Sequence, residues 1–188
     1  LPVARVSVAA GGWVGGGGGG ADDGVLAPGA SGGVGGGLAP LAKRRGARVI
    51  AMAAEAKHAE VAELGPDLIL PRAPENLRTA LGDEKVTVVA DVVGGAQWPR
   101  LIDVLERGGR YTCSGAIAGP MVELDLRTFY LRDLTFTGPT VTLHRSFTDV
   151  LSCLEKGETR PALPAAYPLS DLKAAQTTSI PNTHTGNT

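Results

Sequence analysis

Cysteine is scarce in this sequence, which contains only Cys113 and Cys153. The two residues lie far apart, and neither belongs to a CxxC pair or has a histidine at ligand spacing. The sequence therefore predicts neither a disulfide framework nor a zinc site, and we interpret both residues as reduced thiols of an intracellular protein. The three histidines are equally scattered and form no metal-binding pattern: His58, His144 and His184.

An excess of charge of either sign is also missing, because the formal net charge is -1. No basic stripe with interleaved aromatic residues follows the chain, which argues against nucleic acid and anionic membranes as partners. Long apolar runs of about 18 residues, as a membrane span needs, are absent. Residues 1–14 lack the charged start and long apolar centre of a signal peptide. We therefore expect a cytoplasmic protein.

Glycine, in contrast, is abundant, with 27 residues. The unbroken run Gly15–Gly20 cannot hold regular structure by itself, because glycine loses the most conformational entropy on ordering. We interpret residues 1–22 as a lead-in segment, which is either a flexible linker or a stretch whose side chains have not been identified. Residues 23–188 have the length of one domain of ordinary size.

The most informative stretch is a glycine-rich turn between two apolar runs, at residues 25–28 and 48–53. A helix is expected between them, with Gly46 as its C-cap. Only glycine lets the backbone turn this tightly and lets a charged ligand approach its amides. The pattern predicts a phosphate-binding turn in which backbone amides meet a pyrophosphate. The alternative is a tight helix–sheet contact made by the same residues: Ser31, Gly32, Gly33, Val34 and Gly35.

Short apolar strands alternate with helices along the rest of the chain. We expect strands at 67–70, 86–93, 110–114 and 134–142, and helices at 55–64, 74–81, 98–106, 145–156 and from an N-cap at Ser170 to about Ser179. A short extended piece at 122–126 and a helical turn at 127–132 lie between them. Because Pro139 cannot donate to a ladder, the last strand is expected at a sheet edge. The alternation predicts an α/β domain with a doubly wound parallel sheet.

Several motifs occur in the order and spacing of the cofactor domain of the medium-chain dehydrogenase/reductase superfamily, which the chain resembles. They are LPVA (1–4), GASGGVG (29–35), LAKRRGARVIA (41–51), ELGPD (63–67), DVVGG (91–95), LERGGRYTCSG (105–115), LTFTG (134–138) and HTGN (184–187). The resemblance is strongest to the zinc-free quinone oxidoreductase branch. It implies a Rossmann-type sheet and a GroES-like catalytic domain, absent from this chain, as the other wall of the active site.

The nicotinamide cofactor is expected to be NADPH. An NAD-specific site needs an acid at the end of the second strand, but Ala53 occupies the position that the resemblance gives. Lys57 matches the position where related quinone oxidoreductases place a cation near the 2′-phosphate. Glu55 favours NAD instead, because it lies about twenty residues past the last glycine, so NADH stays an alternative.

Two further loops follow predicted strands, at the carboxyl ends where ligands bind in open α/β sheets. The resemblance implies that they line the nicotinamide ribose and the ring, although turn chemistry alone would also explain them. Their residues are Val93 and Gly94 in the first loop and Ser114, Gly115 and Ala116 in the second. No catalytic residue can be named from the sequence.

The resemblance implies an NADPH-dependent oxidoreductase that transfers hydride to a quinone or an α,β-unsaturated carbonyl. Two alternatives are a non-catalytic NADP(H)-binding module and a zinc alcohol dehydrogenase whose metal-binding domain is missing. A short-chain dehydrogenase is disfavoured, because Tyr111, Tyr130 and Tyr167 lack a lysine four residues later. The resemblance also implies a homodimer formed through the edge strand 134–141.

Overall fold

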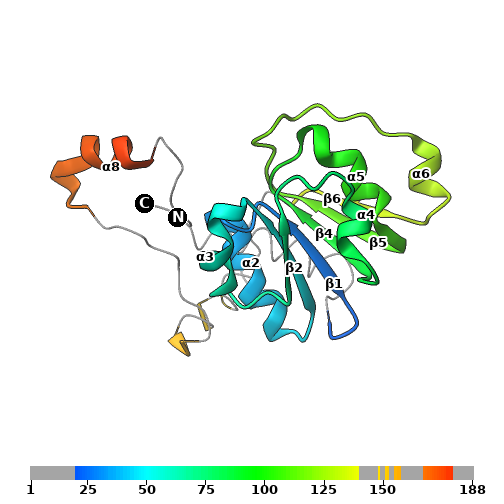
Figure 1. Cartoon of the computed structure of the whole chain (residues 1–188), viewed down its shortest axis with the longest axis horizontal. Helices are drawn as coiled ribbons and strands as arrows, with labels where there is room; N and C mark the ends of the chain where they lie inside the picture. Colours follow the sequence, from blue (N-terminus) through cyan, green and yellow to red (C-terminus); the bar gives the residue numbers. More distant parts are fainter. Residues whose placement is uncertain (1–19, 140–147, 149–150, 153–154, 158–166, 180–188) are drawn as a thin grey trace.

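The computed structural model describes residues 20–139, 148, 151–152, 155–157 and 167–179. Its centre is a parallel sheet of six strands in the order β3-β2-β1-β4-β5-β6 (Figure 1). The doubly wound α/β fold expected from the sequence is therefore confirmed. The strands are β1 (Gly24–Pro28), β2 (Arg48–Ala53), β3 (Leu68–Pro71), β4 (Val86–Asp91), β5 (Leu105–Cys113) and β6 (Thr135–Thr137).

Helices cover both faces of the sheet, as Figure 1 shows. One face carries α2 (Gly33–Arg44) and α3 (His58–Ala62), which follows the short 3-10 helix η1 (Glu55–Lys57). The other face carries α4 (Leu77–Leu81) and α5 (Trp98–Asp103), which follows η2 (Gly95–Gln97). The remaining described helices are α6 (Leu126–Tyr130), η3 (Leu169–Asp171) and α8 (Leu172–Ser179). None of the helices in the described ranges is long and apolar enough to cross a bilayer.

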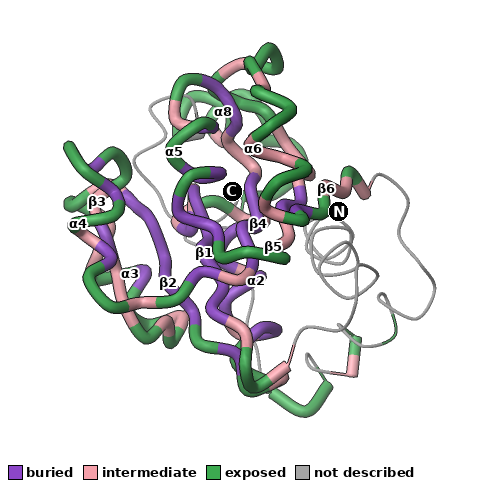
Figure 2. Tube along the Cα trace, turned by 90° about the vertical axis from the view of Figure 1, so that its right-hand side faces the viewer, coloured by how far each residue is buried: buried purple, intermediate pink, exposed green. Residues whose placement is uncertain are grey.

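The core consists of two layers, one on each side of the central strands, and the buried segments in Figure 2 follow these strands. Both faces of β1 and β4 are buried, because successive side chains point to opposite faces and each face meets helices. Leu26 and Val89 pack toward α4 and α5, whereas Val25 and Val88 pack toward α2. This two-sided burial explains why these strands read as continuous apolar runs.

Helix α2 forms in a sequence that disfavours helix, since GVGGGLAPLAKR holds four glycines and Pro40 in its interior. Its buried side chains Leu38, Ala39 and Ala42 pack against β1, β2 and β4. Tertiary packing therefore maintains this helix against its low intrinsic propensity.

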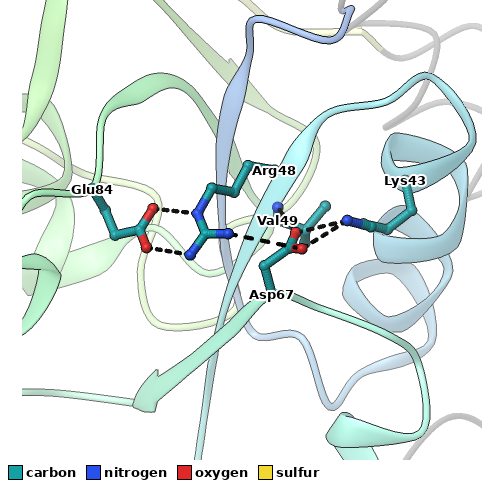
Figure 3. Close-up of polar contacts among 5 residues, drawn as sticks. All are labelled: Lys43, Arg48, Val49, Asp67 and Glu84. Atoms are coloured by element: carbon teal, nitrogen blue, oxygen red, sulfur yellow. Dashed lines mark hydrogen bonds and ion pairs between the residues drawn. The ribbon is translucent and has the colours of Figure 1, made fainter.

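An ionic cluster lies at the end of the sheet where strands β2, β3 and β4 begin (Figure 3). Asp67, just before β3, accepts from Lys43 Nζ at 2.8 and 2.9 Å and from the amide of Val49 at 2.7 Å. Arg48 lies between Asp67 and Glu84 and donates to both Glu84 oxygens at 2.5 Å. The cluster joins the end of α2 to the starts of β2, β3 and β4.

The structure corrects the boundary between the predicted helix 98–106 and the strand after it. Helix α5 ends at Asp103, and β5 begins at Leu105, which pairs with Val86. Arg132 donates to the carbonyl oxygens of Ile102 and Leu105 and so fixes the chain at this transition. Gly108 and Gly109 therefore lie within β5.

Other predicted helices also begin or divide elsewhere. The helix expected at 74–81 begins at Leu77, because Asn76 caps it by accepting from the amide of Thr79 at 3.0 Å. The helix expected at 55–64 divides into η1 and α3. Ser170 lies inside η3 and is not an N-cap. Residues 122–126 form no strand, and the helical turn begins at Leu126 after the cap Asp125.

Strand β6 ends the sheet within the described residues, which agrees with the expected edge strand. Several expectations lie outside the described residues: the lead-in segment 1–19, positions 140–142 of the last strand, most of the helix 145–156, Cys153, His144, His184 and the motif 184–187.

Candidate functional site

The glycine turn after β1 enters helix α2 as the sequence predicts. Gly29 adopts φ 73°, a left-handed conformation that favours glycine, and its carbonyl oxygen accepts from the amide of Gly32 at 3.0 Å. The amide of Ala30 donates to the carbonyl oxygen of Met52 at 3.1 Å, which ties the turn to β2. The N-cap residue is Gly32, and the first intrahelical bond runs from Gly36 to Gly32 at 2.8 Å.

The first turn of α2 presents backbone amides at the carboxyl edge of the sheet. The amides of Gly33, Val34 and Gly35 donate to no partner in the part of the chain that the structure describes, and no side chain caps this end of the helix. No acidic residue lies in the first turn. Backbone amides at the positive end of a helix dipole favour an anion in general.

The turn after β4 lies against the glycine turn. Gly94 and Gly95 adopt φ 63° and 69°. A Cβ atom at Gly29 would lie 2.9 Å from Cγ2 of Val93, so the two turns approach too closely for a larger residue. The structure therefore brings Val93 and Gly94 next to the predicted phosphate-binding residues.

The loop after β5 completes this arrangement. The amide of Ser114 donates to Asp91 O at 3.0 Å, and Ala118 donates to Val93 O at 2.8 Å. A Cβ atom at Gly115 would lie 2.8 Å from the carbonyl oxygen of Val92. Because β1, β4 and β5 are neighbours, the three predicted loops converge at their carboxyl ends, where the connections turn to opposite faces of the sheet. Ala116 belongs to this last loop and is exposed.

Lys57 lies on the other side of the glycine turn, in η1 after β2. Ala53, at the end of β2, is buried, and its carbonyl oxygen lies 3.2 Å from Nε2 of His58. No carboxylate thus occupies the end of the strand, while the exposed Glu55 follows two residues after Ala53. Lys57 belongs to the same edge of the sheet but not to the cluster of loops after β4 and β5.

Sequence reasoning missed two residues of the site, Asp91 and Tyr111. Asp91 is fully buried, and its carboxylate accepts from the phenolic O–H of Tyr111 at 2.7 Å. Burial and the nearby Asp91 charge raise the pKa of Tyr111 far above its ordinary value, so the phenol stays protonated and donates. The available signal was a single carboxylate inside an otherwise apolar strand, because such a group must find hydrogen-bond donors.

Comparison with known proteins identifies the family. The family model described as zinc-binding dehydrogenase matches residues 33–156, which cover most of the site. The chain belongs to the zinc-binding dehydrogenase family. The sequence resemblance to the cofactor domain of the medium-chain dehydrogenase/reductase superfamily is thereby confirmed.

Two curated proteins and one solved structure are similar to this chain. Acryloyl-coenzyme A reductase of Sulfurisphaera tokodaii is 29% identical over 79% of this chain and 44% of its own length. YhfP of Bacillus subtilis, provisionally named a quinone oxidoreductase, is 30% identical over 61% of this chain and 36% of its own. A solved structure from Sinorhizobium meliloti, provisionally named an alcohol dehydrogenase, is 35% identical to this chain with a TM-score of 0.87. The match covers 98% of this chain and 51% of the Sinorhizobium meliloti chain.

The chain thus spans about half the length of these relatives or less. Dehydrogenases of this superfamily are oxidoreductases that bind nicotinamide cofactors. In spite of the family's description, no group of three or more potential metal ligands occurs within the described ranges.

Proposed function

We propose that this chain is the cofactor-binding domain of an NADPH-dependent reductase, which transfers hydride to a quinone or an α,β-unsaturated carbonyl. The observation that carries the proposal is the convergence of three loops at the carboxyl ends of β1, β4 and β5. The family's dehydrogenase chemistry and the relatives' names support the reaction class.

The residues present fit a dinucleotide. The amides of Gly33, Val34 and Gly35 would hold the pyrophosphate, since they have no other partner within the described residues. Ser31 and Gly32 would complete this turn. The loops with Val93, Gly94, Ser114, Gly115 and Ala116 would lie along the nicotinamide half. NADPH supplies the hydride when bound, and the protein orients it and excludes water.

The charge pattern after β2 favours NADPH over NADH. A carboxylate at the position of Ala53 would repel a 2′-phosphate, and none is present there. Lys57, four residues further on, would supply a cation to that phosphate. Glu55 is exposed and works against this preference, so the balance is decided by which side chain lies nearer to the ribose.

The substrate class follows from what the two curated relatives are named for. A quinone and an acryloyl thioester share a carbon–carbon double bond conjugated to a carbonyl, and this electron-poor system is reduced by one hydride and one proton from solvent. One reductase chemistry therefore accounts for both names. We propose this conjugated acceptor as the common feature of the substrate.

Part of the substrate pocket would come from polypeptide beyond this chain, since the relatives are about twice as long or longer. The loop after Ala116 supports this proposal, because it exposes large apolar side chains next to the site. Ile117 is 85% exposed and Met121 87% exposed. Such side chains are suited to form an apolar wall when a second domain covers them.

Separate calorimetric titrations with NADPH and NADH test the proposal, together with the intact mass of the native protein. We expect tighter binding of NADPH and reduction of a quinone or an enoyl thioester by the full-length form. Failure of both nucleotides to bind the full-length form would refute the proposed function.

A second candidate, a zinc alcohol dehydrogenase, is favoured by the Sinorhizobium meliloti neighbour and the family's description. Its metal ligands would lie outside the described residues. Zinc content of about one ion per native polypeptide, with alcohol oxidation lost on chelation, would support this candidate.

A further inference from the structure

Asp91 has three hydrogen-bond donors around its buried carboxylate. Oδ1 accepts from the amides of Val93 at 2.7 Å and Gly94 at 3.1 Å. Oδ2 accepts from the Tyr111 hydroxyl at 2.7 Å and from the amide of Gly94 at 3.1 Å. A fully buried carboxylate is costly unless it is hydrogen-bonded, and here the donors come from one turn and one neighbouring strand.

These bonds connect the end of β4 with β5. In the parallel register Tyr111 lies beside Val89, and Asp91 lies beside Cys113. The Tyr111 side chain therefore reaches along the sheet toward its carboxyl end to meet Asp91. The Tyr111 ring also makes edge-on contacts that do not involve its hydroxyl. Its centroid lies 5.9 Å from that of the Trp98 ring and 5.5 Å from that of the Phe136 ring.

The carboxylate holds a backbone conformation that the site needs. Gly94 adopts φ 63°, and its amide donates to both oxygens of Asp91. A Cβ atom at Gly94 would lie 2.9 Å from the carbonyl oxygen of Gly119, so the turn also fits closely against the loop after β5. A shift of the carboxylate would change the position of both loops.

We propose that Asp91 and Tyr111 are a positioning pair that holds the 93–95 turn against the nicotinamide half of the cofactor. The inference rests on the proposed function. Asp91 accepts from the amides of this turn and from the Tyr111 hydroxyl, and neither side chain bonds the amides of Gly33, Val34 and Gly35. Its loss should therefore weaken contacts to the nicotinamide half and leave the adenosine half unchanged.

The test compares NADPH with 2′,5′-ADP, which carries the adenosine and 2′-phosphate but no nicotinamide. Tyr111→Phe keeps the ring contacts and removes one hydrogen bond, so the Kd of NADPH should rise about fivefold. The Kd of 2′,5′-ADP should stay within about twofold. Asp91→Asn should raise the Kd of NADPH further, because its amide nitrogen cannot accept from Tyr111 or the turn. Tyr130→Phe, at a tyrosine that is 61% exposed, is the control.

If Tyr111 only supported the fold, Tyr111→Phe would raise the Kd of NADPH and the Kd of 2′,5′-ADP equally. That result, or an unchanged Kd of NADPH, would overturn the inference. Hydrogen exchange in the ligand-free protein gives a second readout. The amides of Val93 and Gly94 should exchange faster in Tyr111→Phe than in the wild type, with Gly36 unchanged. If the wild type bound neither ligand, the proposed function would fail, and unchanged exchange at Val93 and Gly94 would separately refute the pair.

Discussion

A Cβ atom at Gly35 would lie 2.3 Å from the carbonyl oxygen of Gly29, closer than any real side chain approaches a backbone oxygen. Gly35→Ala must therefore move the start of α2 away from the glycine turn, at a cost of about 2 kcal/mol. Thermal unfolding and NADPH titration should both detect the change. Gly32→Ala is the stability control, because its Cβ would lie at an ordinary 3.4 Å from the same oxygen. Equal stability of the two variants would contradict this reading.

Lys57 should select NADPH over NADH. Lys57→Met keeps much of the side chain and removes the charge, so the Kd of NADPH should rise about tenfold. The Kd of NADH, which lacks the 2′-phosphate, should stay unchanged. Calorimetric titration of both nucleotides checks the prediction. A parallel loss for NADH would show that Lys57 supports the fold and does not read the phosphate.

Replacing Pro40 should stabilise the protein. A proline inside a helix removes one hydrogen bond and crowds the carbonyl four residues before it, and α2 carries this cost. Pro40→Ala should raise the free energy of unfolding by about 2 kcal/mol. This value already allows for the opposing effect that alanine gives the unfolded chain more conformational entropy than proline does. Pro99→Ala, in the first turn of α5 where proline is tolerated, should bring no gain. Urea unfolding compares the two variants.

The ionic cluster should give the protein an acid-sensitive contribution to stability. Partial burial alone would raise the pKa of Asp67, but the hydrogen bonds from Lys43 and Val49 and the charges of Lys43 and Arg48 lower it below the ordinary 3.8. The Arg48 hydrogen bond likewise lowers the pKa of Glu84, against the opposing effects of burial and Asp67. Because these folded-state pKa values are depressed, the stabilisation is complete above the unfolded values and disappears as pH falls through the folded ones.

Asp67→Asn should therefore cost about 1 kcal/mol at pH 7. The difference in the free energy of unfolding between the variant and the wild type should shrink as the pH falls below about 5. The wild-type carboxyl is then increasingly protonated and loses the charge that asparagine lacks. Urea unfolding at pH 7 and at several pH values below about 5 measures this difference. Asp83→Asn, at an exposed aspartate near the cluster, serves as the matched control. A difference that stays constant with pH would show that charge is not its origin.

Strand β6 should be the dimer contact, as the superfamily resemblance implies. It lies at the end of the described sheet, and an edge strand offers backbone groups to a second copy. Thr135→Lys places a like charge on both copies at this edge and should yield monomers in sedimentation. Thr79→Lys, on an exposed position of α4, should leave the association unchanged. An unaltered dimer in Thr135→Lys would exclude this interface.

The strands of the sheet were predictable because their burial leaves a direct mark on the sequence. Nearly every side chain of Val86–Asp91 is buried, so this strand appears in the sequence as an apolar run rich in β-branched residues. The end of α5 was not predictable, because it depends on Arg132, which contacts Ile102 from 30 residues further along. Local periodicity holds no information about a contact of this kind.

The loops of the candidate site could be placed from the sequence for a similar reason. Parallel strands bring their carboxyl ends to one edge, so Gly94 and Gly115 had to lie near the glycine turn. The Asp91–Tyr111 bond could not be foreseen, since it needs the register of β4 against β5 and the forward reach of one side chain. The sequence alone indicates only that Asp91 requires a donor.

The buried ring of Trp98 makes the site observable by light. The indole is 6% exposed and contacts Tyr111 edge-on, and the only other tryptophan of the sequence, Trp13, lies outside the described residues. Tryptophan emits in the range where reduced nicotinamide absorbs. Occupation of the neighbouring loops should therefore quench the emission of Trp98 and sensitise that of the nicotinamide, which gives an intrinsic optical signal without any attached dye.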